Sequence, residues 1–251
     1  GSMYIPFLAV LTARIPLAGM GWMPHLKGKV RWIFFSLWVP ALLALAGALL
    51  YFLIFPGQFD GELNTLRASM GEETIAMMES QGMTLKLYVI TTSVAALTYA
   101  PFMSIITSIG EEVGWRGALY PYLKEHFGKT KGRVIGGIIW GAWHWPIMIL
   151  AGYEYGLNYV GAPVLGLIAF CCCTVFMGIL HDHVYEKTGL IWMPALFHGA
   201  VNAWTIYAYL LKEEYMDRMI FGPHVVGLIS MIPMAALAVA ISLRERNKDR
   251  V

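Results

Sequence analysis

Long apolar segments separated by short polar connectors dominate this sequence. A helix that crosses a membrane needs roughly 20 consecutive apolar residues, and several segments reach or approach that length. We expect membrane-spanning helices over residues 32–55, 84–109, 134–151, 162–180, 190–211 and 222–243. Residues 4–13 form a shorter apolar run that ends at Arg14. The pattern predicts an all-α fold: a polytopic transmembrane helical bundle with about seven membrane segments.

The connectors between these segments differ in kind. Residues 14–30 carry two prolines and several glycines, which favours an interfacial connector. Residues 56–83 form a polar, acidic loop with room for a short amphipathic helix, and residues 117–128 have the pattern of a surface helix along the membrane. We find no internal repeat, so we expect one integral membrane domain over residues 3–251. Residues 1–2 resemble the remnant of a cleaved tag.

Basic and acidic residues alternate between successive connectors. The basic residues are Lys27, Lys29, Arg31, Lys124, Lys129, Lys131, Arg133, Lys187, Arg244, Arg246, Lys248 and Arg250. The acidic residues of the intervening connectors are Asp60, Glu62, Glu72, Glu73, Glu79, Glu154, Glu213, Glu214 and Asp217. Because cytoplasmic loops carry an excess of Lys and Arg, we expect the basic connectors and the C-terminus in the cytoplasm and the acidic loops outside.

Composition narrows the class of protein further. Charged residues make up 14% of the chain, against about 25% in soluble domains, so the bilayer is the expected partner. A net charge of +2 gives no sign of nucleic-acid binding. The three cysteines are consecutive, at positions 171–173, which fits neither a disulfide framework nor a zinc site. The sequence carries no signal of oligomeric state.

The stretch "GEEVGWRG", residues 110–117, places two carboxylates and an arginine at the end of an apolar run. Glu112 and Arg116 are four apart, with the acid first, which favours an ion pair on one helix face. Glu111 is rotated by about 100° from Glu112, so we interpret Glu112 as structural and Glu111 as free for chemistry. The alternative is a solvated helix end in the headgroup region.

Two further polar sites lie inside predicted spans. In "WGAWHWP", His144 shares a helix face with Trp140, and in "FHGAVNAW", His198 shares one with Asn202. Ionisable groups at membrane depth are candidates for function, although a single such histidine is more often a hydrogen-bonded core residue. Gly137 and Gly141 form a G-x-x-x-G pair that allows close helix approach.

Other polar positions have simpler interpretations. The "HDH" stretch at 181–183 could suggest a metal site, but residues two apart on a helix do not face each other, so an interfacial loop is expected. His224 falls at a predicted connector, and Tyr153 fits an outer aromatic belt.

"EEVGWR", "WGAWH" and "HGAVN" match the patterns E-E-x-x-x-R, aromatic-x-x-x-H and H-x-x-x-N, in this order on successive spans. The ordered set resembles the CPBP family of intramembrane proteases, which includes the Ras-converting CAAX endopeptidases and proteins linked to bacteriocin processing and self-immunity. The resemblance covers residues 84–210, the motif core. It implies a helical bundle with a conical cavity open to the cytoplasm, in a prokaryotic cell membrane.

The resemblance also implies roles. Glu111 corresponds to the general base that activates a water molecule, and His144 to its partner. His198 and Asn202 correspond to the donors that stabilise the oxyanion. Glu112, Arg116 and Trp140 correspond to supporting residues. The expected activity is hydrolysis of a peptide bond near the cytoplasmic face, in a CAAX-type lipidated peptide or a leader or bacteriocin-type peptide, without a cofactor.

Three alternatives stay open at this point. Glu111, His144 and His198 could bind zinc with one open position, although H-E-x-x-H is absent. The chain could be a non-catalytic membrane adaptor or immunity protein that keeps the fold. A small transporter would use the intramembrane acids as coupling sites, but the paired broken helices that would support it are not evident.

Overall fold

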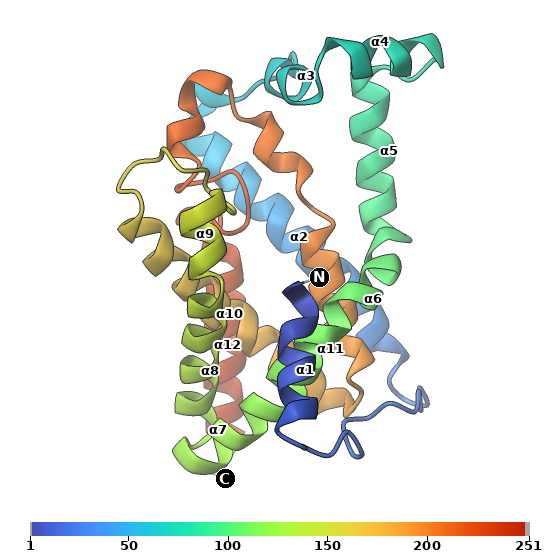
Figure 1. The fold of residues 1–251 in the computed structure, drawn as a ribbon, viewed down its shortest axis with the longest axis vertical. Helices are drawn as coiled ribbons and strands as arrows, with labels where there is room; N and C mark the ends of the chain where they lie inside the picture. Colours follow the sequence, from blue (N-terminus) through green and yellow to red (C-terminus); the bar gives the residue numbers. More distant parts are fainter. Residues whose placement is uncertain (1, 249–251) are drawn as a thin grey trace.

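The computed structural model describes residues 2–248, and within them the chain is helical, without a named β-strand (Figure 1). The longer elements are α1 (Ile5–Thr12), α2 (Val30–Ile54), α3 (Asn64–Met70), α4 (Glu72–Ser80), α5 (Leu85–Leu97), α6 (Ala100–Glu112), α7 (Tyr120–Phe127), α8 (Lys129–Trp143), α9 (Trp145–Ala151), α10 (Val164–Thr188), α11 (Trp192–Asn202) and α12 (Ile232–Lys248). A π-helical segment, η3 (Val113–Leu119), joins α6 to α7, and the short 3-10 turns are η1 (Ser2–Tyr4), η2 (Pro56–Gln58), η4 (Ile206–Leu210) and η5 (Glu213–Arg218). Gly1 of the expected tag remnant and Arg250 lie outside the described residues.

The chain is an integral membrane protein, with fewer full-length spans than the sequence pattern predicts. Three helical stretches of the described residues are long and apolar enough to cross a membrane: Val30–Ile54, Lys129–Ala151 and Val164–Thr188. A fourth is reached if α5 and the helix that starts at Ala100, bent by 60° relative to each other, count as one span. The expected count of about seven is not reached by this measure, because α11 and α12 are only 11 and 17 residues long.

Prolines set the breaks within two of the predicted spans. Pro101 stands at the start of α6 and cannot donate to the carbonyl of Leu97, where α5 ends. The expected straight span over 84–109 is therefore a bent pair. Pro146 has the same effect in the first turn of α9, and His144 lies at the junction between α8 and α9. The broken hydrogen-bond ladder puts a histidine at a helix end in the interior of the bundle.

Glycines allow the helices around this interior to approach closely. A Cβ atom on Gly137 would lie 2.4 Å from the Cα of Val175, and one on Gly141 would lie 2.8 Å from the Cα of Cys171. The close contact predicted from Gly137 and Gly141 is thus confirmed, and it joins α8 to α10. In the same way a Cβ atom on Gly199 would lie 2.6 Å from the carbonyl oxygen of Pro101, which brings α11 against α6.

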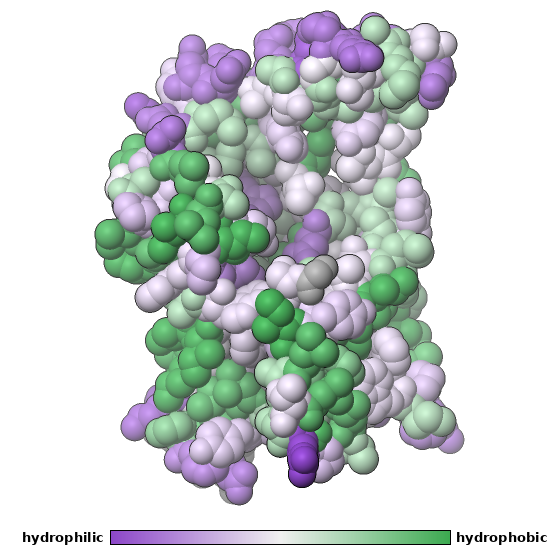
Figure 2. Space-filling view, viewed as in Figure 1, coloured by the Kyte–Doolittle hydropathy of each residue, from purple (hydrophilic) through white to green (hydrophobic). Residues whose placement is uncertain are grey.

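Charge is segregated between the two ends of the molecule. The acidic helix α4 and the segment η5 lie at one end, and α7 and the last turns of α12 lie at the other (Figure 1). Hydrophilic residues cover both ends, and hydrophobic residues dominate much of the surface between them (Figure 2). Leu53 on α2 and Leu150 on α9 are 78% and 81% exposed, as expected for side chains that face lipid. We refer to these as the acidic end and the basic end.

Candidate active site

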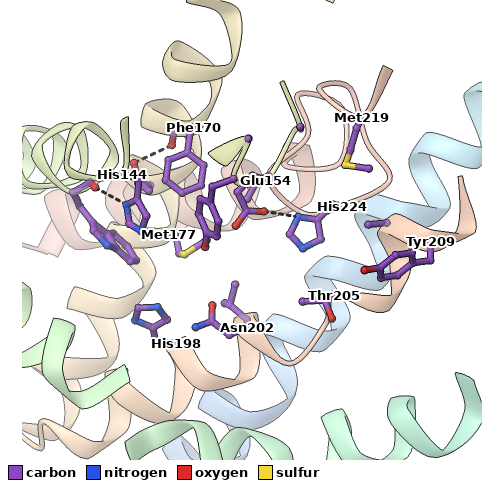
Figure 3. Close-up of a pocket in the computed structure, with 18 of the residues that line it drawn as sticks. His144, Glu154, Phe170, Met177, His198, Asn202, Thr205, Tyr209, Met219 and His224 are labelled. Atoms are coloured by element: carbon purple, nitrogen blue, oxygen red, sulfur yellow. Dashed lines mark hydrogen bonds and ion pairs between the residues drawn. The ribbon is translucent and has the colours of Figure 1, made fainter. Parts of the chain in front are cut away.

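A cavity of about 530 Å³ lies among α8, α10 and α11 and the segments that follow α9 and α11. Four of the residues predicted for the site line it: Trp140, His144, His198 and Asn202. His198 and Asn202 extend from α11 toward the same space as His144 (Figure 3). The structure therefore brings together the second and third sequence motifs, which lie more than 50 residues apart.

Glu111 reaches this group through Trp140. Its Oε2 atom accepts hydrogen bonds from the indole Nε1 atoms of Trp140, at 2.7 Å, and Trp115, at 3.1 Å. Glu111 is only 2% exposed and is not among the residues that line the cavity. Both indole bonds end on Oε2, so Oε1 is the oxygen available to a further group.

Glu112 has different partners, although it is adjacent in sequence. Its Oε1 atom lies 3.1 Å from Nη1 of Arg116 and 2.7 Å from Nδ1 of His198, and both charged side chains are fully buried. The ion pair predicted between Glu112 and Arg116 is confirmed. The remaining guanidinium surface lies over the rings of Tyr120 and Trp140, at 4.8 and 4.2 Å, a favourable cation–π arrangement. Arg116 therefore serves Glu112 and leaves Glu111 to the indoles.

The segment η3 makes this division possible. Trp115 and Arg116 each follow their carboxylate partner by four residues, so one helical turn carries both pairs. The backbone here is π-helical, a conformation that is rare and often found at functional sites. Gly114 lets this turn pack on α1, because a Cβ atom at this position would lie 2.3 Å from Cβ of Pro6.

The hydrogen bonds of the two histidines define their tautomers. Nδ1 of His144 lies 2.9 Å from the carbonyl oxygen of Trp140, which can only accept. Nδ1 of His198 lies 2.7 Å from the carboxylate of Glu112, which also accepts. In both rings Nδ1 is therefore the donor, and Nε2 is the atom left for a substrate or water.

Three residues that the sequence placed elsewhere also line or adjoin this cavity. The ring of Tyr153 stacks on that of His144, with centroids 5.7 Å apart and planes at 11°. Glu154 and His224 form a pair, 3.2 Å between Oε2 and Nδ1, on the cavity wall (Figure 3). Tyr153 is also 38% exposed, so its interpretation as an outer aromatic-belt residue stays a prediction, as does that of His224 as an interfacial residue.

Burial and the His224 contact act in opposite directions on Glu154. Burial disfavours the charged carboxylate, but hydrogen bonds from His224 and Tyr153 and the charge of His224 outweigh it, so the pKa of Glu154 lies below its usual value. Burial raises the pKa of Tyr153 well above its usual value, so this phenol stays protonated and can donate. The cavity wall therefore carries an anionic carboxylate.

His181 is the functional candidate that sequence reasoning missed. The expected interfacial loop at 181–183 is wrong, because these residues lie within α10 and His181 and Asp182 are fully buried. Nδ1 of His181 lies 2.8 Å from the carbonyl oxygen of Met177. His181 falls on the buried face of α10 that contains Thr174 and Met177, and this helical periodicity was the available signal.

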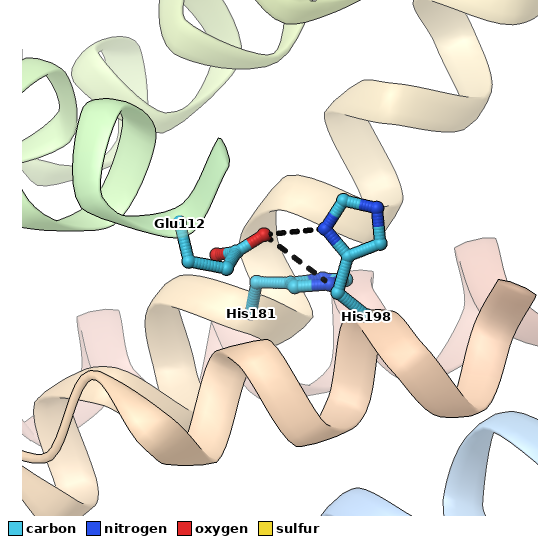
Figure 4. A group of neighbouring side chains, drawn as sticks. All are labelled: Glu112, His181 and His198. Atoms are coloured by element: carbon cyan, nitrogen blue, oxygen red, sulfur yellow. Dashed lines mark hydrogen bonds and ion pairs between the residues drawn. The ribbon is translucent and has the colours of Figure 1, made fainter. Parts of the chain in front are cut away.

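Among the described residues, Glu112, His181 and His198 are the group whose ligand atoms converge as a metal site would require, all within 4.8 Å (Figure 4). The zinc set expected from sequence was Glu111, His144 and His198, so only His198 is common to both. Two His and one Glu is a known catalytic zinc set. However, the 2.7 Å separation of Glu112 and His198 is a hydrogen-bond distance, and Arg116, 3.1 Å from the same oxygen, would repel a cation. The group fits a hydrogen-bond network better than a metal centre.

The comparisons with known proteins agree with this geometry. Residues 92–204 match the family model described as "Type II CAAX prenyl endopeptidase Rce1-like". All seven residues predicted for the site fall within that range. The motif-bearing core of this chain is therefore similar to the CAAX proteases. CAAX prenyl protease 2 from Methanococcus maripaludis is 31% identical over 83 residues, which cover 29% of this chain and 31% of that protein. The alignment therefore spans about a third of this CAAX protease.

The position of the cavity along the molecule is relevant to the side of the membrane from which a peptide would reach it. Besides the motif residues and the side chains of α10, its lining includes Glu154, Met216, Met219 and His224, which belong to the segments that follow α9 and precede α12. The basic clusters lie at the opposite end of α8, α10 and α12. Part of the cavity wall therefore comes from segments near the acidic end, whereas the sequence predicts the basic end in the cytoplasm.

Proposed function

We propose that this protein is an intramembrane endopeptidase that hydrolyses a peptide bond with a water molecule activated by Glu111 and His144. The observation that supports it most is the convergence of His144, His198 and Asn202 on one interior cavity, with Glu111 bonded to the Trp140 side chain of its wall. Three helical segments far apart in sequence contribute these groups. A convergence of this kind in an apolar bundle favours a chemical role.

In the proposed reaction, Glu111 takes a proton from water as the oxygen attacks the carbonyl carbon. Nε2 of His144 is unprotonated in the tautomer described above, so it can accept a hydrogen bond from the same water. The C–N bond then breaks, and the proton held by Glu111 passes to the leaving nitrogen. The cavity lining, within the described residues, includes no serine or cysteine, which favours water over a covalent nucleophile.

His198 and Asn202 are the proposed donors to the oxyanion. Nδ1 of His198 donates to Glu112, and a donor role toward the oxyanion requires that Nε2 carry a proton as well, with the Glu112 carboxylate 2.7 Å from the ring as the partner of that charge. The Asn202 amide supplies a second donor one helical turn away. In an apolar cavity such prearranged donors stabilise the developing charge strongly, with about 2.7–4 kcal/mol for one donor.

A CAAX-type lipidated peptide or a leader-type peptide is the proposed substrate class. The M. maripaludis relative is named a CAAX prenyl protease, which favours the first. Apolar side chains such as Phe170, Met177 and Met219 line the cavity beside the polar groups, which suits an extended peptide with apolar residues. We place the protein in a prokaryotic cell membrane. The charge bias favours the basic end in the cytoplasm, in which case substrate enters the cavity from the acidic, outer end.

The test is a cleavage assay with purified protein and a library of quenched fluorescent peptides. We expect wild type to cleave, Glu111→Ala to lose activity, and Glu73→Ala, an exposed acid on α4, to match wild type. Equal cleavage by wild type and Glu111→Ala would remove the proposed mechanism. Cleavage by none of the three, with the substrate still bound, would identify a non-catalytic adaptor.

A chelator arm of the same assay separates the metal-free mechanism from the zinc alternative. We expect activity to be unchanged after chelation. We also expect elemental analysis to find far less than one metal ion per protein molecule, which is the content that a stoichiometric metal site would require. Loss of activity on chelation and recovery with zinc would overturn the metal-free mechanism.

A further inference from the structure

A second hollow, of about 510 Å³, lies at the basic end between α2, α10 and α12. Arg31, Lys187 and Arg244 line it, one from each helix, together with the apolar side chains of Trp32, Phe35 and Ile241. We call it the basic-end pocket. It contacts the C-terminal end of α10, whereas the cavity of the candidate active site contacts the middle of this helix.

The three cations of this pocket differ from the other cations nearby. Lys124, Lys129 and Arg133 are held in ion pairs by Asp182, Glu186 and Glu245, several at 2.6–3.1 Å. Arg31, Lys187 and Arg244 form no ion pair with any described residue. Arg31 instead lies over the ring of Trp32, 5.6 Å from its centroid.

One acid lines the pocket, and its charge is already committed. Glu245 contacts Arg133 at 2.6 Å, Lys129 at 3.0 Å and Nδ1 of His183 at 2.6 Å. His183 also lines the pocket and adds no negative charge. The pocket therefore carries a net positive charge.

Helix ends explain the positions of two of these cations but not the third. Lys187 and Arg244 lie near the C-terminal ends of α10 and α12, where a positive charge is favoured by the helix dipole. Arg31 lies in the first turn of α2, where the dipole disfavours it, and the N-cap residue Lys29 makes no side-chain cap. The amide end of a 25-residue helix thus adds further positive potential, and three like charges repel one another unless an anion lies between them.

An exposed apolar stripe on α2 leads away from the pocket. In steps of three or four residues from Arg31 and Phe35, the same helix face carries Trp38, Leu42, Leu45, Leu49 and Leu53, which are 42–78% exposed. This face has no protein cover over most of the helix length. A cationic pocket at the interface that continues into an apolar stripe matches the two parts of a phospholipid.

We propose that the basic-end pocket binds the phosphate headgroup of an anionic phospholipid, whose acyl chains lie along the α2 stripe. The Arg and Lys side chains bind the phosphate oxygens, and the aromatic floor contacts the glycerol region. The lipid lies between α2, α10 and α12 and fastens their ends at the basic end.

Reconstitution into nanodiscs that contain phosphatidylglycerol and phosphatidylcholine tests this. Native mass spectrometry of protein released from the discs gives the ratio of bound anionic to neutral lipid. We expect the triple variant Arg31→Gln, Lys187→Gln, Arg244→Gln to lower phosphatidylglycerol retention at least tenfold, since each basic residue near a membrane surface contributes roughly fivefold. The matched control, Arg14→Gln, Lys27→Gln, Lys131→Gln, removes three exposed cations outside the pocket and should retain lipid as wild type does.

Two results would overturn the proposal. An equal loss of phosphatidylglycerol in the control triple would show a diffuse surface-charge effect. The second result concerns the thermal stability of wild type. If millimolar inorganic phosphate raises the Tm in pure phosphatidylcholine discs as much as phosphatidylglycerol does, the ligand is a soluble phosphate. If the triple variant does not fold, the single variant Lys187→Gln, at an exposed helix end, is compared with wild type in the same way. Retention of phosphatidylglycerol at the wild-type level in this variant would contradict the proposal.

Discussion

Two adjacent carboxylates in this bundle have partners that differ in charge. Glu112 has a buried arginine and a histidine as neighbours, whereas Glu111 is bound by two neutral indole N–H groups. This distinction is the residue-scale basis of the proposed mechanism.

Helical spacing was enough to predict part of this arrangement. The i, i+4 relation gave the Glu112–Arg116 pair and the separate direction of Glu111. Spacing could not give the indole bond from Trp140 to Glu111, nor the contact of Glu112 with His198, because these depend on how α6, α8 and α11 pack. His181 was missed because two flanking polar neighbours suggested a loop.

Asn202 provides a residue-scale test of the oxyanion role. We expect Asn202→Ala to lower kcat by about 10²–10³-fold, the usual cost of losing one such donor, with KM little changed. Steady-state kinetics on the best library peptide would measure this. Thr205→Ala, which changes another residue of the cavity lining, serves as control. A kcat within twofold of wild type for Asn202→Ala would contradict the role.

At the scale of elements, prolines and glycines determine where helices break and how closely they pack. The G-x-x-x-G spacing predicted the tight α8–α10 contact correctly. The bend between α5 and α6 was not predicted, although Pro101 was its visible signal, because the apolar pattern runs through it without interruption.

Gly137 tests the importance of this packing. A Cβ atom there would lie 2.4 Å from the backbone of α10, so Gly137→Ala must push the helices apart. We expect a loss of roughly 1–3 kcal/mol in the free energy of unfolding, typical of overpacking. Denaturant unfolding in detergent would measure it. Gly57→Ala, at a position with nothing within 4 Å, should be neutral, and equal stability of both variants would contradict the packing argument.

The Glu154–His224 pair connects the loop after α9 to the segment before α12, and it predicts a pH dependence. The pKa of Glu154 is depressed in the folded protein, so its contribution is present above the unfolded value of 4.5 and is lost as pH falls through the lower folded pKa. We expect the difference in Tm between wild type and Glu154→Gln to be constant from pH 7 to 5 and to shrink below pH 4.5. A difference that grows as the pH falls would contradict the assignment.

For the molecule as a whole, the sequence predicted an all-helical membrane protein and the segregation of charge, because hydropathy and charge can be counted along the chain. The number of full spans and the position of the cavity could not be predicted from such counts. They depend on how broken helices such as α5–α6 and short ones such as α11 pack in three dimensions.

The orientation in the membrane is open to a direct measurement. Single cysteines at Lys131 and at Glu73, in a background without Cys171–Cys173, would mark the basic and acidic ends. We expect a membrane-impermeant thiol reagent to label position 73 in intact cells and position 131 only after the membrane is permeabilised. The reverse pattern would place the acidic end, and the cavity, on the cytoplasmic side.

The central claim is that Glu111, and not its neighbour, activates the water. The most direct test compares kcat and thermal stability of Glu111→Gln and Glu112→Gln on one cleaved peptide. We predict that Glu111→Gln keeps its fold, because the amide oxygen can still accept the indole bonds, and loses about 10²–10⁴-fold in kcat, the usual contribution of a general base. Glu112→Gln should instead lower Tm, because it leaves the Arg116 charge buried without its carboxylate. Wild-type kcat in folded Glu111→Gln protein would contradict the account.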